Sequence, residues 1–302
     1  MILCLGLTPA LQRTLLFKSL EINEVNRALA VAVSAAGKSL NTARALASLG
    51  AECKVAGFNG GYNGEQINRF LTEYGVDSAL TTMSGETRIC STLLDQESGT
   101  VTELVEEAPE PSQTGIQSFV DDNVNLIKHC KMLVISGTLP PYAGDDFYCH
   151  FTSVARKLGI PVVIDSHKSA LLSVLPDKPL MAKLNLRELE ATFDCVVESD
   201  DQIEELLKRV LEQGARSVFM THGKDDAWLV DENQTLKLTP PKIDKHVNPI
   251  GSGDCTTAGI AHKLSSGCSL QEAVAFGIAC GSANVETLLP AEFDLQRVLE
   301  LV

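Results

Sequence analysis

Short apolar runs alternate with helical stretches along most of this 302-residue chain. Ile2–Leu7 and Cys53–Phe58 are typical of buried strands, whereas Ser39–Leu49 and Gly64–Tyr74 have helical spacing and are each followed by a glycine. Strands that alternate with helices predict a mostly parallel sheet with helices on both faces. The same alternation predicts further strands at 132–136, 162–165 and 217–221, and helices at 144–158, 200–213, 253–265 and 269–287.

Two regions, residues 12–35 and 87–105, depart from this alternation. Both are rich in Thr, Val and Leu and contain few helix signals. They are typical of extra strands that form a small sheet beside the main one. Because no tandem repeat or Pro/Gly-rich linker divides the chain, we expect one α/β domain over residues 1–302, with a small β-sheet lid from these two regions.

The charge balance limits the classes of partner. The chain has 39 acidic and 25 basic residues, a formal net charge of −14, and 44% apolar residues. That composition supports a sizeable core, while the negative field repels nucleic acid and anionic membrane surfaces. We therefore expect neither nucleic acid nor membrane as a partner, and a phosphorylated substrate would need a local basic pocket.

The cysteines and the N-terminus indicate the compartment. Nine cysteines without a Cys-x-x-Cys pair do not make a disulfide framework or a zinc ribbon. The run Ile2–Leu7 is too short for a signal peptide, and no stretch approaches the ~20 apolar residues of a membrane helix. We expect a protein of the reducing cytoplasm.

The most informative segment is Asn248–Ala261, with the sequence NPIGSGDCTTAGIA. Asn-Pro predicts a turn, and Gly251, Ser252 and Gly253 are small enough for backbone N–H groups to approach an anion. A helix is expected to begin near Asp254. The positive end of its dipole suits the charge on a phosphoryl group in transfer.

Asp254 is unusual there, because a carboxylate at such a helix terminus repels an incoming phosphate. It could act as a general base that accepts the proton of a hydroxyl. Asp is also a good N-cap residue. On residue physics alone, both roles remain open.

NPIGSGDCTTAGIA resembles the C-terminal signature of the ribokinase-like (PfkB) carbohydrate kinases, and residues 36–43, AGKSLNTA, resemble the first motif of that family. The resemblance implies a ribokinase-like three-layer fold, ATP and Mg²⁺ as cofactors, Asp254 as catalytic base, and an anion hole from Gly251, Ser252 and Gly253. It also implies that Gly37 and Asn41 contact the sugar. Ser39 departs from the small residue usual in the family.

Gly37-Lys38-Ser39 does not form a P-loop, because that motif needs a glycine where this chain has Ala32. The segment Ser136–Pro140 resembles a family turn, and Lys183-Leu184-Asn185-Leu186-Arg187-Glu188 resembles a family segment with Leu184 in place of proline. The resemblance implies that Lys183 and Asn185 meet the nucleotide and that Glu188 organises magnesium through water. It further implies nucleotide contacts at Thr221, Gly223 and Asn284.

The similarity is greatest to the branch of 1-phosphofructokinase and tagatose-6-phosphate kinase, through Val25–Arg27, Ala35–Lys38, Thr87-Arg88 and Val101–Leu104. Lys38 and Arg88 are the cations expected to bind a phosphate already present on the substrate. Gln12 stands where the family has an Asp that binds sugar hydroxyls, and an amide can donate as well as accept. The expected substrate is fructose 1-phosphate or tagatose 6-phosphate.

Two alternatives remain. The chain could phosphorylate an unphosphorylated sugar or a nucleoside, or it could be a catalytically silent sugar-phosphate sensor. An intact Asp254 and glycine turn argue against the sensor. The resemblance also implies a homodimer through the lid, which would cover otherwise unpaired strand edges.

Overall fold

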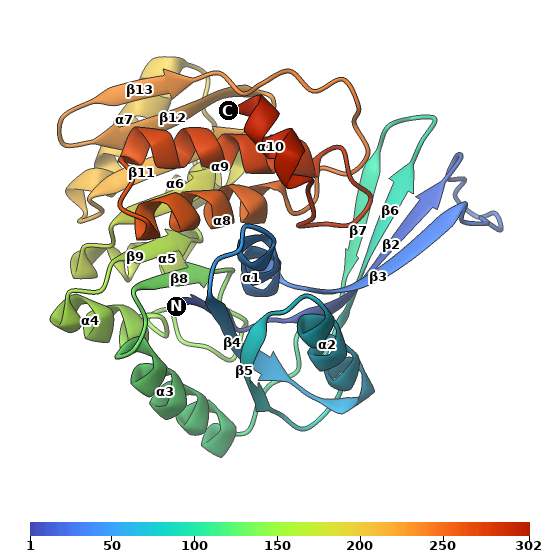
Figure 1. Cartoon of the computed structure of the whole chain (residues 1–302), viewed down its shortest axis with the longest axis horizontal. Coiled ribbons are helices and arrows are strands. Elements are labelled where there is room, and N and C mark those ends of the chain that lie inside the picture. Colours follow the sequence, from blue (N-terminus) through green and yellow to red (C-terminus); the bar gives the residue numbers. More distant parts are fainter.

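The computed structural model describes residues 1–302 and contains one large sheet between two layers of helices (Figure 1). Its nine strands run in the order β13-β12-β11-β10-β9-β8-β1-β4-β5. Pairing is parallel from β5 to β11 and antiparallel for β12 and β13 at one edge. The strands are β1 (Ile2–Leu5), β4 (Cys53–Asn59), β5 (Asp77–Thr82), β8 (Met132–Ser136), β9 (Val162–Asp165), β10 (Met181–Asn185), β11 (Ser217–His222), β12 (Asp225–Asp231) and β13 (Thr235–Leu238).

The two helical layers bury separate cores against opposite faces of the sheet. In β1, Ile2 and Cys4 belong to one core and Leu3 and Leu5 to the other, as strand alternation requires. The first layer consists of α1 (Lys38–Ser48), α2 (Gly61–Glu73), α8 (Ser252–Ser265), α9 (Leu270–Asn284) and α10 (Leu295–Leu301). The second consists of α3 (Gln113–Ile127), α4 (Cys149–Leu158), α5 (Lys168–Leu172), α6 (Leu186–Phe193) and α7 (Asp200–Glu212). The predicted α/β fold with a mostly parallel sheet is confirmed.

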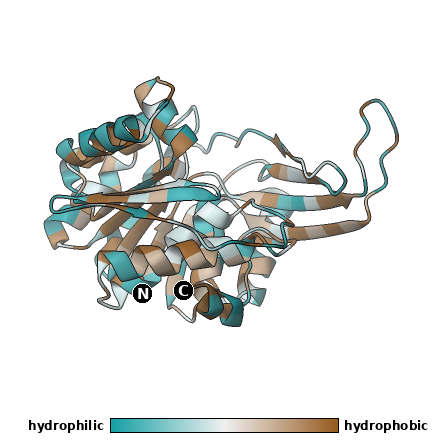
Figure 2. Cartoon of the chain, turned by 90° about the horizontal axis from the view of Figure 1, so that it is seen from above, coloured by the Kyte–Doolittle hydropathy of each residue, from teal (hydrophilic) through white to brown (hydrophobic).

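A second, four-stranded sheet is separate from the large one. Figures 1 and 2 show that it projects from the body of the molecule. Its strand order is β3-β2-β6-β7. The strands fall within or beside the two regions that depart from the alternation, and we call this sheet the lid: β2 (Ala10–Phe17), β3 (Ala30–Ala36), β6 (Ile89–Asp95) and β7 (Val101–Val105). One face of the lid turns toward the carboxyl edge of the large sheet, because side chains from both line a shared cavity.

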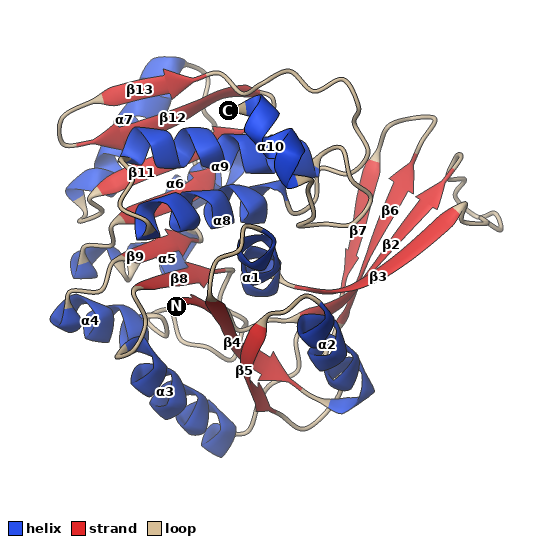
Figure 3. Ribbon diagram, viewed as in Figure 1, coloured by secondary structure: helices blue, strands red, loops and turns tan.

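Several elements differ from the sequence-based expectations (Figure 3). The first strand ends at Leu5 rather than Leu7. At the next residue, Gly6, a Cβ would approach the Ser136 carbonyl oxygen to 2.5 Å, so the backbone segments there pack too closely for a side chain. The helix expected from residue 144 begins at Cys149. Helix α3, which has 15 residues, and the β12–β13 hairpin were not predicted.

No helix combines the length and the apolar character required to cross a membrane.

Candidate active site

A cavity of about 1460 Å³ lies between the lid and the carboxyl ends of the parallel strands. Open parallel sheets place ligands at this edge, because the loops after the strands and the N-termini of helices converge there. The predicted site residues that line it come from the lid, α1, β10, α6, β11 and α8: Gln12, Gly37, Lys38, Asn41, Arg88, Lys183, Asn185, Glu188, Thr221, Gly223, Gly251, Ser252, Gly253 and Asp254. The fold therefore brings together all but one of the predicted residues.

The first turn of α8 forms one wall. Its N-cap, Gly251, has a φ of +85°, and a Cβ there would lie 2.4 Å from the backbone nitrogen of Ala291. Only glycine is accommodated in such a position. The backbone N–H groups of Gly251, Gly253 and Asp254 donate to no protein acceptor. Three free donors at the positive end of a helix make an anion site.

Asn284 is the predicted site residue that the structure does not bring to the cavity. It is fully buried in α9, and its Nδ2 donates to the Ile250 carbonyl oxygen and to Ser252 Oγ, both at 3.0 Å. The family resemblance implied a nucleotide contact for Asn284. The geometry instead makes Asn284 a positioning residue, because it fixes the turn that carries the anion site.

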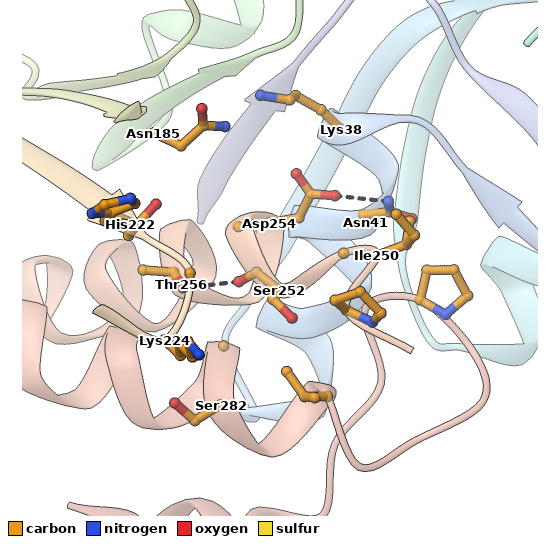
Figure 4. A pocket seen from close by; sticks show the side chains of 18 of the residues that line it. Lys38, Asn41, Asn185, His222, Lys224, Ile250, Ser252, Asp254, Thr256 and Ser282 are labelled. Atoms are coloured by element: carbon orange, nitrogen blue, oxygen red, sulfur yellow. Dashed lines mark hydrogen bonds between the residues drawn. The ribbon is translucent and has the colours of Figure 1, made fainter. Parts of the chain in front are cut away.

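Asp254 lies on the cavity floor in the first turn of α8 (Figure 4). Its Oδ2 accepts a hydrogen bond of 2.8 Å from Asn41 Nδ2. The N-cap position belongs to Gly251, so the alternative role of Asp254 as N-cap is wrong. Burial raises the pKa of Asp254 to about 6, and nearby Asp165 adds to the rise while Lys38 opposes it. A carboxylate with a pKa near neutrality suits proton transfer.

Beneath Asp254, two lysines share one buried carboxylate that the sequence analysis did not single out. Asp165, at the end of β9, accepts from Lys38 Nζ at 3.1 Å, from Lys183 Nζ at 2.9 Å and from Thr257 Oγ1 at 2.6 Å. Burial favours the protonated form of Asp165, but Lys183 and Lys38 outweigh burial and lower its pKa. For Lys38, burial is likewise outweighed by Asp165 and Glu188, which raise its pKa. The raised pKa keeps Lys38 charged beside the base.

Glu188 and Asn185 form a reciprocal capping box at the start of α6. Asn185 Oδ1 accepts from the Glu188 N–H at 2.9 Å, and Glu188 Oε2 accepts from the Asn185 N–H at 2.8 Å. Glu188 Oε1 also accepts from Lys38 Nζ at 2.9 Å. Asn185 therefore faces the cavity but uses its carbonyl oxygen as a cap.

No cluster of three or more His, Cys, Asp or Glu side chains is able to hold a metal ion directly. Glu188, one of the carboxylates that line the cavity, fits Mg²⁺ that keeps most of its waters and takes its remaining ligands from nucleotide phosphates. The residues present therefore fit a Mg²⁺ ion that Glu188 holds through water rather than by a direct bond.

The end of the cavity away from the lid was only partly predicted. Thr221 and Gly223 line it at the β11–β12 turn, as expected, together with His222 and Lys224 (Figure 4). Apolar residues from the loop before α8, from α9 and its C-cap, and from the loop after α9 complete it: Pro240, Pro241, Ile243, Pro249, Ile278, Val285 and Pro290. In the sequence, the dipeptide Pro240-Pro241 was the feature that could have indicated this end of the cavity. Apolar side chains of this kind suit an aromatic base.

The end of the cavity under the lid contains the predicted sugar contacts. Gly37 has a φ of +104°, and a Cβ there would lie 2.9 Å from the Thr8 carbonyl oxygen, which explains the glycine. Gln12 is buried on β2 and donates from Nε2 to Thr92 Oγ1 at 2.7 Å. Arg88 donates to the carbonyl oxygens of Thr8 and Glu106, at 2.9 and 3.2 Å.

Residues 1–294 match the model of the family described as pfkB family carbohydrate kinase. The fold is shared with phosphofructokinase-2 from Escherichia coli in complex with fructose-6-phosphate, at 25% identity, a TM-score of 0.87, and coverage of 99% of this chain and 97% of that one.

Two further solved structures show the same fold. One is a possible 1-phosphofructokinase from Thermotoga maritima, with 21% identity, a TM-score of 0.90 and coverage of 99% and 96%. The other is Arabidopsis thaliana ribokinase complexed with ribose and ATP, with 18% identity, a TM-score of 0.80 and coverage of 99% and 97%.

The family match and the ribokinase-like architecture agree with the two motifs that converge on Asp254. The chain belongs to the pfkB family of carbohydrate kinases.

Proposed function

We propose that this carbohydrate kinase transfers the γ-phosphoryl group of ATP to a hydroxyl of a sugar phosphate of the fructose 1-phosphate or tagatose 6-phosphate type. The observation that carries the proposal is the placement of Asp254. Its carboxylate lies at the free N–H end of α8, is held by Asn41, and has a pKa of about 6. A base and an anion site at one point are what phosphoryl transfer to an alcohol requires.

In this mechanism, Asp254 accepts the proton of the acceptor hydroxyl as its oxygen attacks the γ-phosphorus. The bond from phosphorus to the β,γ-bridging oxygen breaks, and ADP leaves with those electrons. The N–H groups of Gly251, Gly253 and Asp254 stabilise charge on the transferred group. Lys183 and Lys38, which both bind Asp165, add positive charge near Asp254. Mg²⁺, when bound with ATP near Glu188, neutralises part of the phosphate charge.

The substrate's own phosphate is assigned to the sugar end of the cavity, where Arg88 is the cation of the lid. Its guanidinium is anchored by two carbonyl oxygens, which leaves further N–H groups for a phosphate. Lys38 stands closer to Asp254, where it can contact both the acceptor and the transferred group. In support, phosphofructokinase-2 from E. coli, 25% identical, has been solved with fructose-6-phosphate.

A kinase for an unphosphorylated sugar or a nucleoside is the second candidate. One observation favours it: Lys38 already has Asp165 and Glu188 as partners at 3.1 and 2.9 Å. If both ion pairs persist when substrate binds, Arg88 alone remains for a substrate phosphate.

An ADP-release assay with ATP and Mg²⁺ tests the proposal across fructose 1-phosphate, tagatose 6-phosphate, fructose 6-phosphate, fructose and ribose. We expect turnover with one of the first two phosphosugars. Turnover confined to fructose or ribose would favour the second candidate, and fructose 6-phosphate alone would replace the expected sugar. No turnover with any of the five sugars would favour the remaining alternative, a catalytically silent sugar-phosphate sensor.

We also propose that two copies associate through the outer face of the lid. Val31, Val33 and Leu104 expose 51%, 38% and 56% of their surface there. Apolar side chains on a projecting sheet are costly in water and typical of an interface. Light scattering at micromolar concentration should give the mass of a dimer, and a mass near 32.4 kDa would contradict this proposal.

A further inference from the structure

The cavity-facing side of the lid carries two neighbouring rows of side chains. In one row, Gln12 on β2 lies opposite Cys90 on β6, which lies opposite Val105 on β7. In the next, Thr14 lies opposite Thr92, which lies opposite Glu103. Side chains two residues apart on a strand share a face and are separated by about 7 Å. Gln12 and Glu103 thus occupy adjacent rows on the same face.

The amide of Gln12 has a fixed orientation. Its Nε2 donates to Thr92 Oγ1 at 2.7 Å and to the Arg13 carbonyl oxygen at 3.4 Å, and the second contact requires the NH₂ group because a carbonyl oxygen only accepts. The other amide atom, Oε1, accepts no hydrogen bond from the protein and belongs to a residue that lines the cavity. Gln12 therefore offers an acceptor to the cavity, as a carboxylate would at the same position.

Glu103 is the one carboxylate that the lid contributes to the cavity lining. No side chain or backbone group of the protein forms a hydrogen bond or an ion pair with it, in contrast to Asp254 and Glu188. Its neighbour in the row, Thr92, is fully buried and already accepts from Gln12. Two acceptors, one neutral and one charged, therefore face the sugar end of the cavity without a protein donor.

The positive charge of Arg88 lies at the start of lid strand β6. Arg88 directly precedes β6. Thr92, which pairs with Glu103, lies four positions further along that strand. By strand geometry, Arg88 and Thr92 are therefore about 13 Å apart. A phosphate dianion is attracted to Arg88 and repelled by Glu103. Sugar hydroxyls, which can donate, are favoured by Glu103.

We propose that Glu103 is a specificity-determining residue that accepts hydrogen bonds from sugar hydroxyls beside the Gln12 carbonyl oxygen and so directs the substrate's phosphate toward Arg88. This inference rests on the proposed function. It defines the substrate as a monophosphate whose free hydroxyls face Glu103 and whose phosphate faces Arg88, with the reacting hydroxyl at Asp254. A sugar whose phosphate lies against Glu103 is rejected by charge.

Glu103→Gln tests the role of the carboxylate, with the phosphosugar that the wild-type enzyme turns over best as the probe. We expect the KM for that sugar to rise about tenfold, since a hydrogen bond to a charged group is lost at a partly exposed site. The kcat and the KM for ATP should be retained, because Glu103 touches neither the base nor the anion site. Glu107→Gln is the matched control, since Glu107 is exposed and lies outside the cavity lining.

Glu103→Arg tests the orientation of the substrate. If hydroxyls face the lid, this variant should raise the KM more than Glu103→Gln does. A fall in KM would mean that the phosphate lies at Glu103, which overturns the proposal. The proposal is also overturned if the wild-type enzyme turns over the probe and Glu103→Gln has the same KM for it as the wild-type enzyme. If the wild-type enzyme uses no sugar phosphate, the proposed function fails together with the inference, so the two failures are distinguishable.

Discussion

The first turn of α8 and the inner face of the lid form opposite walls of one cavity, and they are built differently. At α8, glycines without space for a Cβ and the buried Asn284 hold the backbone in one conformation. On the lid, Gln12 is held by one hydroxyl, and Glu103 has no protein partner. Rigid elements suit a reaction that depends on fixed donors, while a less constrained wall suits selection of the substrate.

If this comparison holds, substitutions at α8 should act on kcat and substitutions on the lid should act on KM. The predictions that follow test that division.

The largest effect is expected for Asp254→Asn. An amide cannot accept the hydroxyl proton, so kcat should fall by about 10²–10⁴-fold. Single-turnover measurements with ATP and the preferred sugar would report the change, and ATP affinity by calorimetry should be retained. Turnover at the wild-type rate would remove Asp254 from the role of base.

The same substitution should stabilise the fold in a pH-dependent manner. The pKa of Asp254 is about 6 in the folded protein, against 3.8 for an unperturbed Asp. A raised acid pKa means that the folded state binds the proton more tightly, so the contribution of Asp254 to stability is greatest below pH 3.8 and is lost as the pH rises through 6. At pH 8 the ionised carboxylate costs up to about 3 kcal/mol.

Urea unfolding of Asp254→Asn should therefore show a gain of up to about 3 kcal/mol at pH 8, which shrinks as the pH approaches 4. In the wild-type enzyme, kcat/KM should rise as the pH increases through about 6, because the base must be ionised. A gain in stability that is constant between pH 8 and pH 4.5 would contradict the raised pKa.

On the lid, Arg88→Ala should raise the KM for the phosphosugar about 10- to 100-fold with little change in kcat, because a charged phosphate contact is lost. Initial-rate kinetics with varied sugar phosphate measure this. Arg13→Ala is the control, since Arg13 is an exposed lid arginine outside the cavity lining. A fall in kcat with an unchanged KM would break the division between the two walls.

The smallest effect on activity is expected for Asn284→Ala, which touches no substrate. Loss of its hydrogen bonds to Ile250 and Ser252 should loosen the anion site and lower kcat about tenfold. Thermal unfolding should also show a loss of about 1–3 kcal/mol. Asn123→Ala, which removes a buried hydrogen bond in α3, should lower stability without affecting kcat. Equal kcat losses in both variants would indicate a general effect of folding.

Local patterns in the sequence predicted much of the fold, and the family resemblance supplied most of the candidate site residues. The glycine turn before Asp254 was visible because a positive φ and close approach both require glycine. The strand–helix alternation predicted the parallel sheet, and the Thr- and Val-rich regions marked the lid strands.

Only the tertiary structure decided which partners these residues have. Asp165 lies far in the chain from Lys38, at the end of another strand, and no spacing rule connects them. The same holds for Asn284, which was expected at the nucleotide and instead fixes the turn at Ile250. Glu103 faces the cavity because β7 pairs with β6 in one particular register. Backbone preferences act over a few residues, whereas burial, ion pairing and the raised pKa of Asp254 depend on neighbours that folding brings from distant parts of the chain.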